Sequence, residues 1–160
     1  MGSIRSVFLG VAVMFLAALP VSAQDRPDFT GAWTRVVPSA SSDSSYVETV
    51  AQKGNEITVH VESKASFGSW GSMYSGEHTY TIGGPLESKK DAEGRVRSVA
   101  VSWDGPQLAF LRTTTEGANV TTERESWSLS ADGTKLTKER QTTDWRGTKH
   151  ERLVFQRNAG

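Results

Sequence analysis

Apolar and polar side chains alternate along much of the chain. In residues 55–63, Ile57, Val59 and Val61 occupy every second position, and polar side chains lie between them. Successive side chains of a strand point to opposite faces, so this pattern predicts a strand with one buried face. After the first 23 residues, no apolar run has convincing helical spacing. The pattern therefore predicts an all-β protein.

Turn signals divide the chain into nine predicted strands. Pairs such as Gly54-Asn55, Asp104-Gly105, Asp132-Gly133 and Arg146-Gly147 fall at fairly regular intervals. We predict strands at residues 30–37, 46–52, 56–63, 77–82, 95–103, 107–114, 120–130, 135–143 and 148–157. This spacing is typical of an antiparallel up-and-down meander that closes into a small barrel of about 8–10 strands. Because such a barrel needs an even number, either residues 66–74 contain a tenth strand or one of the nine lies outside the barrel.

The N-terminus has the order of a secretory signal peptide. Arg5 precedes an apolar run at residues 7–19, which Pro20 and the small residues up to Ala23 follow. The run is too short to cross a bilayer as a helix, so we expect cleavage after Ala23, with an uncleaved anchor as the alternative. Residues 24–160 then form a single domain, exported to the periplasm or the extracellular space.

Composition excludes several classes of function. The chain has 18 basic and 18 acidic residues, and Arg5 leaves with the signal peptide, so the mature charge is 17 minus 18, about −1. This balance argues against nucleic acid and against stable association with an anionic membrane. There is no cysteine for a disulfide, a thiolate metal site or a lipid anchor, and the three histidines lack metal-ligand spacing. No nucleotide-binding or other cofactor motif is present, so we expect no cofactor.

The turn positions fix a register for three hairpins, and with it the face on which each side chain lies. The turn at Asp132-Gly133 pairs Leu129 with Leu136, Trp127 with Lys138, and Glu125 with Arg140. The turn at Trp145-Arg146 pairs Leu136 with Phe155, Lys138 with Leu153, and Arg140 with Glu151. The turn at Asp104-Gly105 pairs Val101 with Leu108, Val99 with Phe110, and Arg97 with Arg112. One face then runs from apolar side chains at one end to charged side chains at the other, and we expect it to face the barrel interior.

The charged end predicts a mouth ringed by Arg97, Arg112, Arg140, Glu125 and Glu151. One interpretation is a cross-strand ladder of Glu125, Arg140 and Glu151 beside solvent, in which each pair contributes under about 1 kcal/mol. In the other, the arginines bind the acidic or polar head of a small amphipathic ligand whose apolar part lies against Trp127, Leu153 and Phe110. Arginine suits this role because its planar donors match a carboxylate two at a time.

An enzyme is the second hypothesis, as an isomerase or hydrolase that uses Glu125 or Glu151. Flanking arginines lower the pKa of a carboxyl group, which is the wrong direction for a general acid near neutral pH. We therefore favour ligand binding over catalysis.

Residues 66–76 interleave aromatic side chains, Trp70 and Tyr74 among them, with three glycines. The segment is interpreted as a lid over the cavity, which makes Trp70 and Tyr74 candidate ligand-binding residues, or as a surface that binds another protein. An irregular strand that packs its aromatics inward is the alternative. The protein is expected to be a monomer or a weak dimer, since an unpaired edge strand invites association.

Two segments carry a resemblance to a known family. Gly31-Ala32-Trp33, on a first strand just after the leader, resembles the G-x-W opening of the lipocalin and avidin-like barrels. The resemblance implies that Trp33, together with Phe29, seals one end of a barrel and that Arg157 packs across the indole. Residues 125–157 are similar to the closing hairpins of small exported bacterial proteins with lipocalin-like folds and no assigned activity.

Overall fold

The computed structural model of the protein describes residues 26–37, 45–67 and 70–159, without the side chains of residues 65–71. The expected signal peptide lies outside these residues. The described residues are all-β. The strands are β1 (Gly31–Arg35), β2 (Ser45–Lys53), β3 (Glu56–Phe67), β4 (Trp70–Thr81), β5 (Glu87–Lys90), β6 (Val96–Asp104), β7 (Gln107–Glu116), β8 (Asn119–Leu129), β9 (Lys135–Asp144) and β10 (Gly147–Arg157). Within the described ranges, no helix long and apolar enough to cross a membrane is found.

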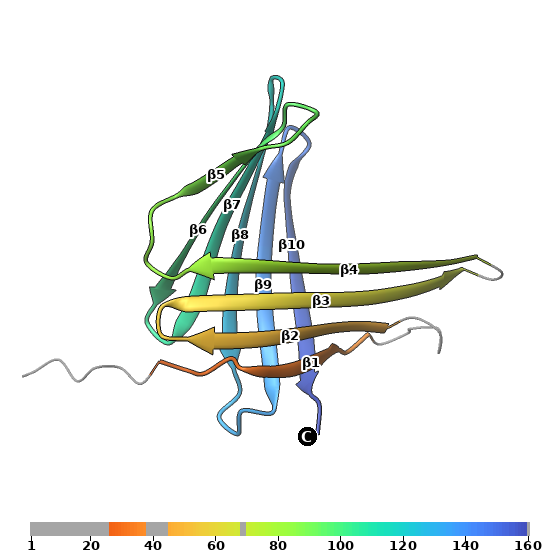
Figure 1. The fold of residues 1–160 in the computed structure, drawn as a ribbon, viewed down its shortest axis with the longest axis vertical. Helices are drawn as coiled ribbons and strands as arrows, with labels where there is room; N and C mark the ends of the chain where they lie inside the picture. Colours follow the sequence, from red (N-terminus) through yellow and green to blue (C-terminus); the bar gives the residue numbers. More distant parts are fainter. Residues whose placement is uncertain (1–25, 38–44, 68–69, 160) are drawn as a thin grey trace, which may run out of the picture.

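The strands form one antiparallel meander in the order β4-β3-β2-β1-β10-β9-β8-β7-β6-β5. Figure 1 shows that β1–β4 run across the direction of β6–β10, and the two groups join where β1 pairs with β10. The sheet curls back on itself until Ile82, just after β4, forms a bridge with Val101 of β6. The result is a curled half-barrel, and the predicted fold class is confirmed.

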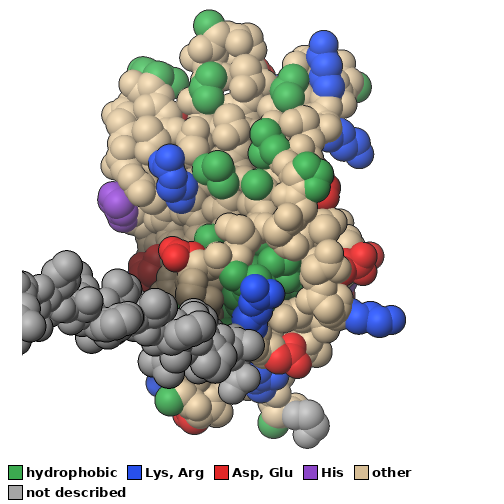
Figure 2. Space-filling view, turned by 90° about the vertical axis from the view of Figure 1, so that its left-hand side faces the viewer, with side chains coloured by type: hydrophobic (Ala, Val, Ile, Leu, Met, Phe, Trp, Pro, Cys, Tyr) green, Lys and Arg blue, Asp and Glu red, His purple; other side chains and the backbone are tan. Residues whose placement is uncertain are grey.

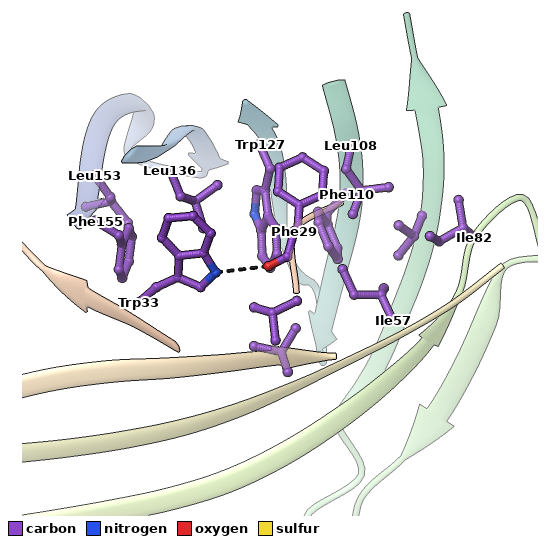
Figure 3. Close-up of a cluster of buried hydrophobic side chains, with 13 residues drawn as sticks. Phe29, Trp33, Ile57, Ile82, Leu108, Phe110, Trp127, Leu136, Leu153 and Phe155 are labelled. Carbon is purple, nitrogen blue, oxygen red and sulfur yellow. Dashed lines mark hydrogen bonds between the residues drawn. The ribbon is translucent and has the colours of Figure 1, made fainter. Parts of the chain in front are cut away.

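Thirteen buried hydrophobic side chains fill the space between the two crossed groups of strands. Figure 3 shows Trp127, Leu136 and Phe155 of β8–β10 on one side of this core and Ile57 of β3 on the other. These four residues occupy alternating, inward positions of their strands, as the period-two pattern requires. Burial of these side chains is the main favourable contribution to folding.

One end of the half-barrel is sealed by Phe29 and Trp33, which are completely buried. The Trp33 indole Nε1 donates a hydrogen bond to the Phe29 carbonyl at 3.0 Å. The Arg157 guanidinium carbon lies 4.2 Å from the centre of the Trp33 ring, so Arg157 packs across the indole as the resemblance implies. Gly31 makes this possible, because a Cβ there would lie 2.6 Å from Arg157 Nη1 and its φ of +148° disfavours other residues.

The nine predicted strands are all present, but the tenth is not where it was expected. It is β5, whose four residues Glu87–Lys90 are all exposed and include no apolar side chain. The alternation of apolar and polar positions therefore gives no signal there. Residues 66–67 and 70–74 instead extend β3 and β4, in line with the strand alternative for this segment, and its role as a lid stays a prediction.

The predicted registers are confirmed for two hairpins and wrong for the third. The β8–β9 and β9–β10 pairs are those expected. In β6–β7 the turn residues are Gly105 and Pro106, so the pairing shifts by two positions and sets Val99 opposite Arg112. Gly105 adopts φ of +57° in this turn. The shift preserves which face each residue occupies, but it moves Arg97 away from Arg112.

Candidate functional site

The interior of the half-barrel has an apolar floor covered by charged side chains. Trp127 is buried against Phe29, Phe110 and Lys138, with ring centres 5.8 Å and 4.7 Å from those of the two phenylalanines. Figure 3 shows Phe29 and Phe110 beside the Trp127 ring. The floor is therefore packed by its own side chains, and polar groups begin directly above it.

Lys138 and Glu48 form a buried ion pair on this floor. Lys138, on β9, bonds to the carboxylate of Glu48 on β2, and both side chains are almost fully buried. The Lys138 Nζ also lies 3.6 Å from the centre of the Trp127 ring, a favourable cation–π distance. Tyr46 donates its hydroxyl to the second Glu48 oxygen at 3.1 Å. Burial lowers the pKa of Lys138, although Glu48 and Glu125 oppose that shift.

Glu125 is the centre of a second group of charges. Its Oε2 accepts from Arg140 Nε at 2.7 Å and contacts Arg140 Nη2 at 2.6 Å, while Oε1 accepts from the Trp127 indole at 2.7 Å. Arg112 Nη1 donates to Oε1 at 3.4 Å. Burial by itself raises the pKa of Glu125, but Arg112, Lys138 and Arg140 outweigh it and lower the pKa to about 2. Glu125 is therefore ionised at neutral pH and holds no proton for a general acid to donate.

The two arginines keep donors that face away from Glu125. Arg112 donates through Nη1, to Glu123 at 2.8 Å and to Glu125. Among the described residues, its Nε and Nη2 make no hydrogen bond, and the same holds for Nη1 of Arg140. Both side chains are about one-third exposed, at 29% and 30%. Guanidinium edges of this kind are suited to a planar anion such as a carboxylate.

A hollow of about 540 Å³ adjoins Arg140 on the inner face of β9 and β10. In the register, Arg140 faces Glu151, and the next inner pair is Thr142 with Lys149. Lys149 and Glu151 are ion-paired at 2.9 Å. The lining residues are Thr142, Asp144, Arg146, Gly147, Thr148, Lys149 and Glu151. The wall next to Arg140 is therefore polar.

The wall next to Arg112 is aromatic. The Arg112 guanidinium carbon lies 4.7 Å from the centre of the Phe110 ring and 5.9 Å from that of Tyr80, on β4. His78 stacks on Tyr80 with ring centres 6.2 Å apart. Tyr74 occupies the same face of β4 as these two, because it lies an even number of positions away. The arginines thus lie between a polar wall and a partly exposed aromatic one.

The predicted mouth residues are brought together only in part. Arg112, Arg140 and Glu125 meet as described, but Arg97 does not join them. It faces Thr114, is 62% exposed, and lies 3.9 Å from Asp91, because the β6–β7 register is shifted. Its prediction as a mouth residue is wrong for this reason.

Four further predicted site residues lie close to the interior charges or along β4. Glu151 faces Arg140 in the register but pairs with Lys149 of its own strand, so the predicted Glu125–Arg140–Glu151 ladder is replaced by one that uses Glu123. Tyr74 is on β4 and half exposed, and Trp70 begins β4 with a side chain outside the described residues. Trp127 is covered in this structure, and its contact with a ligand stays a prediction.

Sequence reasoning missed Glu48 and Tyr46. Both share the inward parity of Val50 on β2, and that parity was the available signal. The position of β2 relative to β9 could not be predicted from the sequence. The two strands are not hydrogen-bonded to each other, because β1 and β10 lie between them in the sheet. A buried partner for Lys138 was therefore not foreseen.

A second hollow, of about 470 Å³, lies across the outer face of β6–β10. Small side chains, including Ala100, Ala109 and Ser126, form its floor, and Arg124 and His150 stand at its margin. Figure 2 shows that, on the face it presents, hydrophobic side chains of the upper half are scattered rather than gathered. Glu125 and Arg140 also border this hollow, but the Glu125 carboxylate bonds to Arg140 and to the buried Trp127 indole, so we place the candidate site inside the half-barrel.

Neither a protein-family model nor a curated protein matches the sequence. Solved structures do match over almost their whole length. The REP1-NXSQ fatty acid transporter has a TM-score of 0.54 and 10% identity, covering 82% of this chain and 96% of that one. The zebrafish ileal bile acid-binding protein complexed with cholic acid has a TM-score of 0.50 and 14% identity, covering 81% and 98%. Secretory abundant heat soluble protein 4 of Ramazzottius varieornatus has a TM-score of 0.50 and 13% identity, covering 81% and 94%.

The shared feature is the fold. At these identities the likeness shows a common β-barrel architecture and no more. It agrees with the lipocalin-like resemblance at the level of fold.

Proposed function

We propose that the protein binds a small amphipathic carboxylate at the mouth of the half-barrel. The observation that carries this proposal is the pair Arg112 and Arg140, which is held by buried Glu125 and yet keeps outward donors at the mouth. The head group binds Nε and Nη2 of Arg112 together with Nη1 of Arg140. The apolar part lies along Tyr80, His78 and Tyr74 of β4.

The ion pairs with Glu125 prepare the arginines for this role. A guanidinium group that is already held in place loses little side-chain entropy when a ligand binds. The interior holds three carboxylates and three cations, which form ion pairs: Glu48 with Lys138, Glu123 with Arg112, and Glu125 with Arg140. A bound carboxylate would place its negative charge next to the outer edges of the two arginines. This arrangement favours an acidic head group over a basic one.

Two of the structural neighbours support the ligand class. One is named a fatty acid transporter, and the other is complexed with cholic acid. Both names point to amphipathic carboxylates, which is also the class that the Arg112 and Arg140 donors suit. The floor under these donors is filled by Trp127, Phe110 and Phe29, so the ligand lies above the core rather than within it.

We also propose that the protein acts outside the cytoplasm. The support is the signal-peptide order of the first 23 residues. An exported binding protein of this kind would hold a sparingly soluble acid in an aqueous compartment.

Native mass spectrometry of protein purified from its own exported fraction tests the binding proposal. The wild type is expected to retain a ligand of mass and charge consistent with an amphipathic acid. The variant Arg112→Lys/Arg140→Lys keeps both charges beside Glu125 but loses the planar donors, so the ligand is expected to be lost. Arg124→Lys/Arg152→Lys, on the outer face, is the matched control and should retain it. Equal retention in both variants contradicts the proposal.

A further inference from the structure

The sheet has two edge strands, β4 and β5, and they differ in how well they are protected. β5 has four residues and ends in Lys89 and Lys90. Short length and lysine side chains are common devices against pairing with another strand. β4 has twelve residues, with no lysine, arginine or proline among them. Only one edge therefore carries the usual protection.

The backbone of β4 is regular along this edge. Its register with β3 runs one residue against one from Glu56–Thr81 to Phe67–Trp70, so no bulge interrupts it. Figure 1 shows the β3–β4 hairpin projecting beyond the other strands. Past the end of β4, the Gly83 amide donates to the Val101 carbonyl of β6 at 2.7 Å. The sheet closes on itself at this hydrogen bond. Within the described residues, the edge at 72–79 faces no other strand.

The side chains along this edge are exposed and uncharged for the most part. Met73 is 80% exposed and Tyr74 53% exposed. Glu77 is the single carboxylate of β4. An exposed, regular edge of this length is a template for backbone hydrogen bonds to another strand.

We propose that β4 pairs antiparallel with β4 of a second copy of this chain, about a twofold axis through Ser75. A twofold axis places the same edge on both sides, so each hydrogen bond formed by one copy is repeated by the other. The two copies then form a continuous sheet through their projecting hairpins.

The side chains favour this register on both faces. On one face, Tyr74 lies opposite Gly76 of the second copy. Gly76 is covered by Tyr74 of its own chain, whose hydroxyl lies where a Cβ would be, so the two Tyr74 side chains meet on this face as diagonal neighbours across the axis. On the other face, Met73 lies opposite Glu77 of the second copy, and Lys64 is next to Met73 on β3. Lys64 therefore extends toward a carboxylate of the second copy.

A single-cysteine variant tests the axis directly, because the chain has no cysteine of its own. Residues directly opposite in an antiparallel pair have Cα atoms about 4.5–5.5 Å apart, within the range that a disulfide spans. Ser75→Cys is expected to give a covalent dimer under mild oxidation at least about tenfold faster than Ala131→Cys, an exposed site between β8 and β9. Equal rates contradict the proposal, and faster coupling of Met73→Cys than of Ser75→Cys contradicts the register.

Sedimentation velocity over a range of concentrations gives the second readout. The wild type is expected to shift from monomer to dimer as its concentration rises. Ser75→Lys places two like charges across the axis and should remain monomeric, while Ala131→Lys adds the same charge elsewhere and should associate like the wild type. A wild type that stays monomeric at all concentrations, or a Ser75→Lys variant that associates equally well, overturns the proposal.

Discussion

Lys138 lies with its ammonium nitrogen 3.6 Å from the centre of the Trp127 ring. Lys138 comes from β9 and bonds across the interior to Glu48 of β2, two strands that β1 and β10 separate in the sheet. The ion pair thus links the two crossed halves of the half-barrel. It also forms the base on which the charged layer with Arg112 and Arg140 lies.

Removing one partner of this ion pair is expected to destabilise the protein strongly. Lys138→Met leaves the Glu48 side chain buried without its partner, and Glu48→Gln leaves Lys138 without its carboxylate, each at a cost of about 3–5 kcal/mol. The double variant Glu48→Gln/Lys138→Met keeps an acceptor for Tyr46 and should lose less stability than either single variant. Urea unfolding of the four proteins measures these differences.

The control for this experiment is Lys149→Met, which removes an exposed partner of Glu151. Surface ion pairs contribute about 0–1 kcal/mol, so its unfolding midpoint should change little. If the double variant loses the sum of the two single effects, Lys138 and Glu48 do not act as a pair.

Stability is expected to fall in acid because of Glu125. Its pKa is about 2 in the folded protein and 4.5 without the fold, so the ionised form is favoured by folding. This contribution is complete above about pH 4.5 and is lost as the pH falls from 4.5 toward 2, with a size of up to about 3 kcal/mol. Unfolding free energies measured from pH 2 to pH 7 should show this loss. In Glu125→Gln the pH dependence over that interval should be weaker, and an unchanged pH dependence would contradict the assignment.

Gly31→Ala is expected to destabilise the closed end by about 1–3 kcal/mol, since the new Cβ meets Arg157 and the backbone φ is unfavourable. Arg157→Ala should remove the collision but not the backbone strain. In thermal unfolding, the double variant is therefore expected to lose less stability than the sum of the two single losses. Full additivity would show that the guanidinium is not held against Gly31.

The exported protein is expected to begin at Gln24. Cleavage after Ala23 leaves residues 24–28 before Phe29, which seals the closed end. N-terminal sequencing of the mature protein measures this position. Recovery of an intact residue 1 in the exported fraction would favour the uncleaved anchor.

Most of the fold was predictable from the period-two pattern, because burial of one strand face places apolar residues at alternate positions. The two C-terminal hairpins were also predictable in register, since Asp132-Gly133 and Trp145-Arg146 mark their turns. The β6–β7 register was not, because Asp104-Gly105-Pro106 allows more than one turn position and the structure uses Gly105 and Pro106. β5 was missed since all four of its residues are exposed.

The candidate site was predictable where it lies within consecutive hairpins. Glu125, Arg140 and Arg112 face one interior because β7, β8 and β9 are neighbours. The contact between Glu48 and Lys138 depends on the curvature of the sheet, which brings β2 over β9. No local sequence pattern predicts how close these two strands come. A single charged residue at an inward position of a strand, such as Glu48 between Tyr46 and Val50, is the sequence signal that indicates a buried ion pair.

Calorimetric titration tests the central claim most directly, with two probes that share one tail and carry opposite charges. Dodecanoate is expected to bind at one site per chain, and dodecyltrimethylammonium at least about tenfold more weakly. The affinity for dodecanoate should fall in Arg112→Lys/Arg140→Lys, which keeps both charges but loses the planar donors, and persist in Arg124→Lys/Arg152→Lys. Equal affinity of the wild type for the two probes, or an unchanged affinity for dodecanoate without Arg112 and Arg140, would contradict an arginine site for amphipathic carboxylates.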